Sequence, residues 1–127
     1  MARPRLTFDA EAFNVEFPGL AAFAAARRRV RVPYGDVASV AVDAPEWSPP
    51  FTWRVGSHLP LVMEMGSFRY RGRKRINYFT RRTTRALVVR LRPGARWTDL
   101  TLDLEEPGTA ATELRMRLAS AGQARDS

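Results

Sequence analysis

The amino-acid sequence predicts a mainly β domain that ends in a single α-helix. Short segments in which apolar and polar residues alternate follow one another along most of the chain, and glycines and prolines separate them. This pattern is typical of half-buried strands joined by turns. Apolar residues repeat at helical spacing only after Pro107. Because 127 residues suit one domain, we predict a single domain over 1–127, with a core at about 6–121 and a flexible tail at 122–127.

In the first half of the chain, turn signals separate the segments with strand character. Asp9–Ala12 is expected to form a tight turn or a bulge, and Pro18-Gly19 a turn. Tyr34–Asp36 is expected to form a turn or one helical turn. Three prolines within Ala44–Pro50 predict a loop, because proline cannot donate a hydrogen bond to a strand ladder. Gly56–Pro60 is expected to be a further connection. The expected strand segments are 6–8, 13–17, 20–32, 37–42 and 51–55.

In the second half, Gly72–Lys74 is predicted to be a hairpin turn, and Pro93-Gly94 is a second turn signal. The segment 97–105 has the clearest alternation, with leucines on one face and Thr101, Asp103 and Glu105 on the other. The expected strand segments are 61–70, 75–79, 86–92 and 97–105.

Pro107 is expected to begin the helix, because proline suits the first helical position, and Gly122 is expected to end it. If the apolar side of this helix packs on the strands, Leu118→Ala costs about 2–5 kcal/mol. The apolar helix positions are Ala111, Leu114, Leu118 and Ala121. The predicted core comprises Phe13, Val15, Val40, Val42, Leu87, Val89, Leu100 and Leu102, packed against Leu114 and Leu118.

Three segments together resemble the bacterial pleckstrin-homology-like domains. They are Val32–Val37 (VPYGDV), Gly66–Arg69 before a hairpin, and Ala86–Pro93 followed by a strand that ends at Glu105-Glu106-Pro107. The resemblance covers roughly residues 6–121 and rests on the order and spacing of the segments. It implies a small antiparallel β-barrel or sandwich of about seven strands, capped by the C-terminal amphipathic helix, and a noncatalytic interaction or scaffold domain.

Some members of this family bind inositol phospholipids through basic residues around the first strand–strand loop. That loop corresponds here to Phe17–Leu20, which contains no basic residue, so the resemblance assigns no lipid pocket to this chain. A second departure is Glu106, where the family pattern has an aspartate, which caps a helix better than glutamate does.

The basic residues of this chain are segregated. The net charge is +8, from twenty arginines and one lysine against thirteen acids, yet the window Met65–Thr98 holds eleven basic residues and no acid. A segregated positive field attracts anionic partners and is screened by salt. The alternative interpretation is a solvated surface without a binding role. The candidate residues for binding an anion or a partner are Arg69, Arg71, Arg73, Lys74, Arg75, Arg81, Arg82 and Arg85.

Arginine forks bind carboxylates and phosphates through charge-assisted hydrogen bonds. We therefore expect this basic hairpin, residues 69–85, to contact a protein partner or a second copy of the chain. Attachment to an anionic membrane or to nucleic acid is the alternative. Trp47 is a second candidate, either as a partner contact or as a cover for one end of the fold. The other aromatic residues of this region are expected to pack in the core or on strand faces rather than to serve as stacking platforms; they are Trp53, Phe68, Tyr78 and Phe79.

The sequence offers little for catalysis. It contains no cysteine and a single histidine, His58, in an expected loop, so we predict no enzymatic activity, cofactor or metal site. No apolar run reaches the roughly 20 residues that a membrane-spanning helix needs; Leu20–Ala26 is the longest. The N-terminus lacks the apolar region of a signal peptide. We expect a cytoplasmic protein, with peripheral attachment to a membrane as an option.

Overall fold

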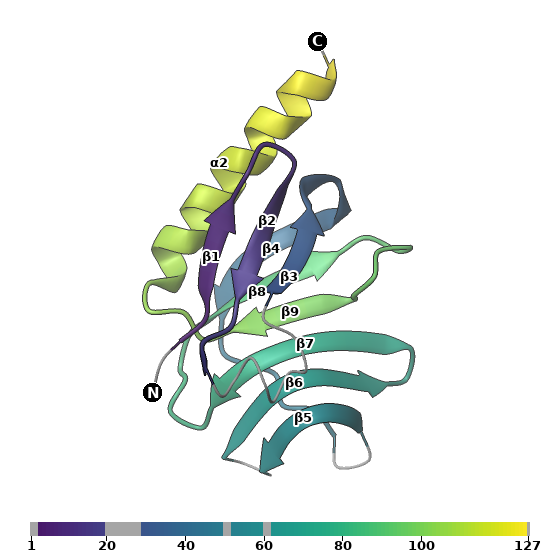
Figure 1. Cartoon of the computed structure of the whole chain (residues 1–127), viewed down its shortest axis with the longest axis vertical. Helices are drawn as coiled ribbons and strands as arrows, with labels where there is room; N and C mark the ends of the chain where they lie inside the picture. The colour runs from purple at the N-terminus through teal and green to yellow at the C-terminus, as the bar shows by residue number, and fades with distance from the viewer. Residues whose placement is uncertain (1–2, 20–28, 50–51, 60–61, 127) are drawn as a thin grey trace.

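The computed structural model describes residues 3–19, 29–49, 52–59 and 62–126, with the backbone alone at 55–59 and 123–126 (Figure 1). Within these ranges the chain forms nine strands and a long C-terminal helix, α2, so the predicted mainly β fold with a C-terminal helix is confirmed. The helix spans Pro107–Asp126, and η1 is a single 3-10 turn at Tyr34–Asp36. The strands are β1 (Arg5–Phe8), β2 (Ala12–Glu16), β3 (Arg29–Pro33), β4 (Val37–Asp43), β5 (Trp53–Leu59), β6 (Met63–Tyr70), β7 (Arg73–Thr80), β8 (Ala86–Leu91) and β9 (Asp99–Leu102).

The strands form two sheets. Sheet A has the order β1-β2-β3 and sheet B the order β4-β8-β9-β7-β6-β5. Both sheets have free edges and neither closes on itself, so the structure does not confirm a barrel. The prediction of a wholly antiparallel arrangement is wrong at one position, since β9 pairs antiparallel with β8 and parallel with β7. β9 lies between these two strands, which run in opposite directions, and it must therefore be parallel to one of them.

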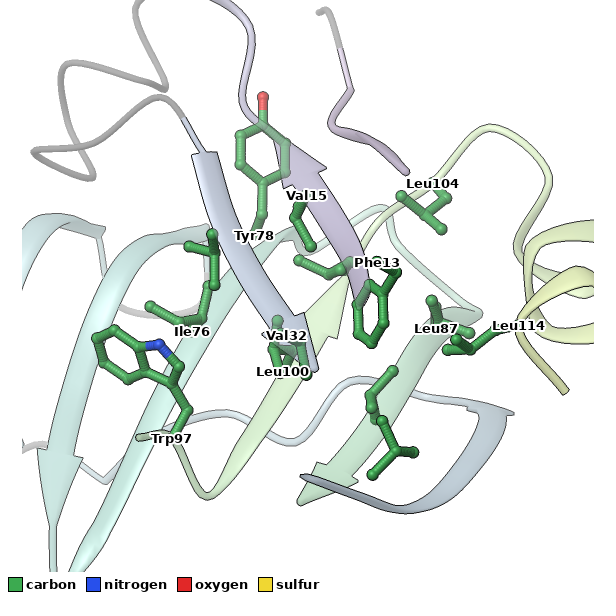
Figure 2. Close-up of a cluster of buried hydrophobic side chains, with 14 of the residues drawn as sticks. Phe13, Val15, Val32, Ile76, Tyr78, Leu87, Trp97, Leu100, Leu104 and Leu114 are labelled. Atoms are coloured by element: carbon green, nitrogen blue, oxygen red, sulfur yellow. The ribbon is translucent and has the colours of Figure 1, made fainter. Parts of the chain in front are cut away.

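The main hydrophobic core lies where sheet A packs on one face of sheet B (Figure 2). Phe13 and Val32 from sheet A meet Ile76, Leu87 and Leu100 from sheet B, and all five side chains are nearly inaccessible to solvent. Of the predicted core residues, Val40, Val42 and Leu118 are only partly buried. Those predicted correctly as fully buried are Phe13, Val15, Leu87, Val89, Leu100, Leu102 and Leu114.

Helix α2 packs against β4, β8 and η1 through its apolar positions. Ala111 and Leu114 are buried, and the Arg115 guanidinium donates a hydrogen bond of 2.8 Å to the carbonyl of Val40 in β4. The expected helix end at Gly122 is wrong, since the helix continues to Asp126. A glycine inside a helix costs only about 1 kcal/mol relative to alanine and keeps its backbone hydrogen bonds. In the described part of the chain, no helix combines the length and the apolar character needed to cross a membrane.

Several element boundaries differ from the prediction. The segment Gly56–Leu59 is not a connection but continues β5, because Gly56 pairs with Gly66 and thereby keeps the strand in register. The segment 97–105 forms a strand only at Asp99–Leu102. Of the expected strand at 20–32, residues 20–28 lie outside the described part, and β3 begins at Arg29.

The β6–β7 turn consists of Arg71 and Gly72, because Tyr70 pairs with Arg73, and it begins one residue earlier than predicted. Both turn residues have positive φ angles, 47° and 78°. This is the conformation of a type I′ hairpin turn, which favours Asn-Gly. A side chain such as that of arginine is disfavoured at positive φ.

We therefore expect Arg71→Asn to raise the free energy of unfolding by about 0.5–1 kcal/mol. The measurement is urea denaturation monitored by circular dichroism. Arg69→Asn is the matched control, because it makes the same change at an exposed position of the adjacent strand. Equal effects of the two substitutions would contradict the assignment to the turn.

The turn between β1 and β2 is held by the Asp9 carboxylate. One oxygen accepts hydrogen bonds from the backbone amides of Glu11 (2.8 Å) and Ala12 (3.0 Å), and the other accepts one from Arg31 (2.6 Å). The backbone amide of Glu11, followed by the Arg31 guanidinium, lowers the pKa of Asp9 from 3.8 to about 2. The ionised form is therefore favoured by folding.

A group whose pKa is depressed on folding stabilises the protein above its unfolded pKa, and this contribution is lost as the pH falls through the folded pKa. We expect Asp9→Asn to lower the melting temperature at pH 7. The difference from the wild type should narrow as the pH falls from about 4 to about 2. Thermal unfolding across this range tests the prediction, with Glu11→Gln in the same turn as the control. A difference that does not depend on pH would contradict it.

Candidate functional site

The eight basic candidate residues do not form one surface. Arg69, Arg71 and Lys74 are exposed at the tip of the β6–β7 hairpin, and their charged groups form no hydrogen bond or ion pair within the described residues. Arg81, Arg82 and Arg85 lie in the turn that follows β7. The eight residues of β7 place this turn roughly 25 Å from the hairpin tip.

Arg75 is not a surface residue, because its side chain is only 1% exposed and forms part of a buried polar network. Its Nε donates to Asp99 (2.9 Å), and its Nη atoms donate to the hydroxyls of Tyr70 (3.2 Å), Ser48 (3.3 Å) and Thr101 (3.3 Å). All three guanidinium nitrogens thus have partners. The structure therefore places Arg75 inside the protein, with its guanidinium bonded to Asp99 and to three hydroxyls, and its predicted role in binding an anion or a partner stays a prediction.

Arg73 extends this network towards the surface. It donates to Asp99 (2.8 Å) and to Glu46 (2.5 Å), and Glu46 also accepts from the Tyr70 hydroxyl (3.1 Å). The hydrogen bond from Arg73 holds the pKa of the Glu46 carboxyl below its usual value. Glu46 and Asp99 lie outside the acid-free window Met65–Thr98 in the sequence. Folding brings both carboxylates into contact with Arg73, which lies inside the window. Within the described residues, the exposed arginines of the window and Lys74 have no carboxylate partner, so they remain available to a binding partner.

The loop 44–49 covers the face of sheet B that points away from the main core. Trp47 packs edge-on against the buried ring of Phe79, with 5.0 Å between the ring centroids. The backbone amide of Ser48 donates to the buried Glu64 carboxylate (2.8 Å), which also accepts from Asn77 (3.1 Å). Trp47 thus packs on a face of sheet B rather than at one end of the fold, and its predicted role as a partner contact stays a prediction.

The other aromatic residues divide into two groups. Phe68, Tyr78 and Phe79 are buried, as predicted, whereas Trp53 is 72% exposed, contrary to the prediction. Trp53 is the first residue of β5, the edge strand of sheet B.

The arginine turn, residues 81–85, borders a cavity of about 690 Å³. Arg81, Arg82 and Arg85 are exposed, and their guanidinium groups form no hydrogen bond or ion pair with any described residue. The remaining lining of the cavity includes cationic, hydroxyl and acidic side chains. These are Arg3, Thr80, Thr83, Thr84, Asp103 and Glu105.

Threonine hydroxyls hold the backbone of this turn. The Thr80 amide donates to the Thr83 hydroxyl (3.1 Å), and the Arg82 amide donates to the Thr80 hydroxyl (3.2 Å). Thr83 in turn donates to Asp103 (3.0 Å), whose carboxylate also forms an ion pair with Arg3 (3.5 Å). The turn is therefore fixed to the end of sheet B by polar contacts that do not involve the side chains of its three arginines.

His58 lies in β5 rather than in the expected loop, and its side chain is outside the described part of the structure. Among the described residues, no three or more His, Asp or Glu side chains form a group that could hold a metal ion. The chain matches no protein-family model, no curated protein and no solved structure.

Sequence reasoning missed Glu46, Asp99 and Arg3. The first two bind arginines of the acid-free window, and Arg3 lines the cavity at the arginine turn. A signal for Asp99 was present, because it lies on the polar side of a strand whose other side carries three leucines. This signal did not identify Asp99 as a buried ion-pair partner, since alternation alone does not reveal whether both faces of a strand are covered.

Proposed function

We propose that this chain is a noncatalytic interaction domain that binds an acidic segment of a protein partner at the arginine turn. The observation that carries the proposal is that Arg81, Arg82 and Arg85 line one cavity of about 690 Å³ and that their guanidinium groups pair with no described residue. Each of them can form two parallel hydrogen bonds to a carboxylate. By contrast, the forks of Arg73 and Arg75 are occupied by internal carboxylates.

The distribution of charge favours a protein segment over a membrane or nucleic acid. Asp103 and Glu105 line the same cavity as the three arginines, and these carboxylates repel an extended anionic surface. The exposed cations of the hairpin tip lie at the other end of β7, so they do not enlarge this surface. A short acidic segment can instead contact the arginines while staying clear of the two carboxylates.

The family assignment is part of this proposal. A mainly β chain that ends in a helix packed on its sheets supports a pleckstrin-homology-like fold. The open sheets and the parallel pairing of β7 with β9 differ from the closed antiparallel arrangement that the sequence resemblance implies.

The test compares binding of a fluorescein-labelled oligoglutamate peptide to the wild type and to a turn variant, Arg81→Gln/Arg82→Gln/Arg85→Gln. The measurement is fluorescence anisotropy at low and at near-physiological salt. We expect the turn variant to bind at least about tenfold more weakly, because it loses the charge-assisted hydrogen bonds. Binding by the wild type should weaken as salt screens the charges.

The matched control is a tip variant, Arg69→Gln/Arg71→Gln/Lys74→Gln, which removes the same number of positive charges at the other end of β7. We expect it to bind within about twofold of the wild type. Equal losses in both variants would show attraction to net charge alone and would overturn the proposal. Phosphatidylserine vesicles and oligothymidylate serve as rival ligands, and tighter binding to either one would support membrane or nucleic-acid attachment instead.

A further inference from the structure

A second cavity, of about 840 Å³, lies between β1 and the first turns of α2. Much of its lining is apolar, with Leu6 and Phe8 from β1, Leu104 from the segment before the helix, and Ala110 from the helix itself. We call this cavity the β1–α2 groove. Figure 1 shows α2 alongside β1 in this part of the molecule.

The β1–α2 groove adjoins the cavity at the arginine turn. Arg3, Leu104 and Glu105 line both of them, so a ligand in one cavity lies next to the other. Leu6 and Phe8 pack on the main core and keep part of their surface accessible. Apolar surface of this kind contributes about 25 cal/mol per Å² when a partner covers it.

Charge differs between the two cavities. The arginine turn supplies three cations that have no ion-pair partner among the described residues. Glu105, Glu106 and Glu113 line the β1–α2 groove together with Arg3 and Arg5, whose guanidinium groups pair with Asp103 and Glu16. Acidic residues of a ligand are therefore attracted to the arginine turn and repelled from the groove, which suits apolar side chains.

The edge of β1 adds a third feature. β1 pairs with β2 and with no other described strand, so the backbone groups along its other edge have no strand partner. Arg5, Leu6 and Phe8 of β1 line the groove together with Pro4, which precedes the strand, so the groove runs along β1. A groove along a strand edge suits an extended chain.

We infer that the acidic segment is extended and carries apolar side chains beside its acidic residues, with the apolar part in the β1–α2 groove. This inference rests on the proposed function, because the acidic part of the segment occupies the arginine turn. Charge complementarity at one end and apolar lining at the other fix the orientation of the segment.

The test uses three fluorescein-labelled peptides: oligoglutamate, and oligoglutamate extended by Phe-Leu-Phe at either its N-terminus or its C-terminus. We expect one of the two extended peptides to bind at least about tenfold more tightly than oligoglutamate. The gain should appear for one extension only, because the groove lies on one side of the arginine turn.

Thr109→Trp, an exposed position on the groove, places a large side chain in the groove without altering the core. We expect it to abolish the gain from the extension while leaving oligoglutamate binding unchanged. Thr112→Trp, exposed on the same helix and away from the groove, is the matched control and should keep the gain. Thermal unfolding of both variants checks that they fold.

The outcomes separate the inference from the proposed function. If neither extension improves binding, or if Thr109→Trp and Thr112→Trp behave alike, the inference is overturned, even when the turn variant still loses oligoglutamate binding. If the turn variant binds oligoglutamate as the wild type does, the proposed function fails as well. A gain for one extension that only Thr109→Trp abolishes supports both.

Discussion

Asp99→Asn is expected to lower the free energy of unfolding by about 3–5 kcal/mol. Asp99 is the carboxylate that compensates Arg75, a guanidinium that is 1% exposed beneath the loop 44–49. Asparagine keeps the shape of the side chain but removes its charge, which leaves a buried cation without a counter-ion. Since small domains are stable by only about 5–15 kcal/mol, this single change should remove a large part of the stability. Urea denaturation monitored by tryptophan fluorescence measures it.

Arg75→Met is the informative comparison, because it removes the other partner of the same ion pair. Asp99 then still receives the hydrogen bond of 2.8 Å from Arg73, so no charge is left without a partner. We expect a smaller loss, about 1–3 kcal/mol. A larger loss for Arg75→Met than for Asp99→Asn would contradict the assignment of Asp99 as the shared counter-ion of the two arginines.

Leu114→Ala is expected to cost about 2–5 kcal/mol, the usual range when a leucine is truncated in a packed core. Leu114 is fully buried and connects α2 to the core between the two sheets, where Figure 2 shows it beside Leu87. The lost transfer free energy and the cavity that remains both contribute to the cost. Denaturation by urea, or the shift in melting temperature, measures the effect.

Leu118→Ala is the control for this prediction. From the sequence alone we expected about 2–5 kcal/mol for it, but Leu118 is only partly buried, one helical turn beyond Leu114. We therefore expect Leu118→Ala to cost clearly less than Leu114→Ala. Equal costs would show that the second half of the described helix is packed as tightly as its first half.

Most strands could be predicted because a strand with one covered face has apolar residues at alternate positions of its own sequence. Ala86–Arg92 alternates in this way, and Val37–Val42 consists of small and β-branched residues that favour a strand. Both form strands within a residue of the prediction. The prediction ends the strand β5 at residue 55, because Gly56 resembles a turn signal in the local sequence. The pairing of Gly56 with Gly66 keeps Gly56 within β5. The local sequence pattern does not reveal a pairing partner on another strand.

For the candidate site too, the local sequence does not reveal contacts between residues that are far apart in the chain. The sequence identifies the arginines and the absence of acids among them, but Arg75 and Arg82 look alike in the chain. In the structure, Arg75 is paired with Asp99 under a loop, and Arg82 is exposed at a turn. Which arginine meets a carboxylate depends on contacts across 24 residues or more, because Glu46 and Asp99 approach from either side of the window.

The sequence by itself determined that the chain is mainly β, that one helix ends it, and that positive charge gathers between Met65 and Thr98, because periodicity and composition are local properties. Only the tertiary structure decided that the sheets stay open and that β9 inserts between β7 and β8. It also decided which arginines stay free at the cavity beside the arginine turn. These features depend on strand order and on the coverage of both sheet faces, which arise when residues far apart in the chain meet.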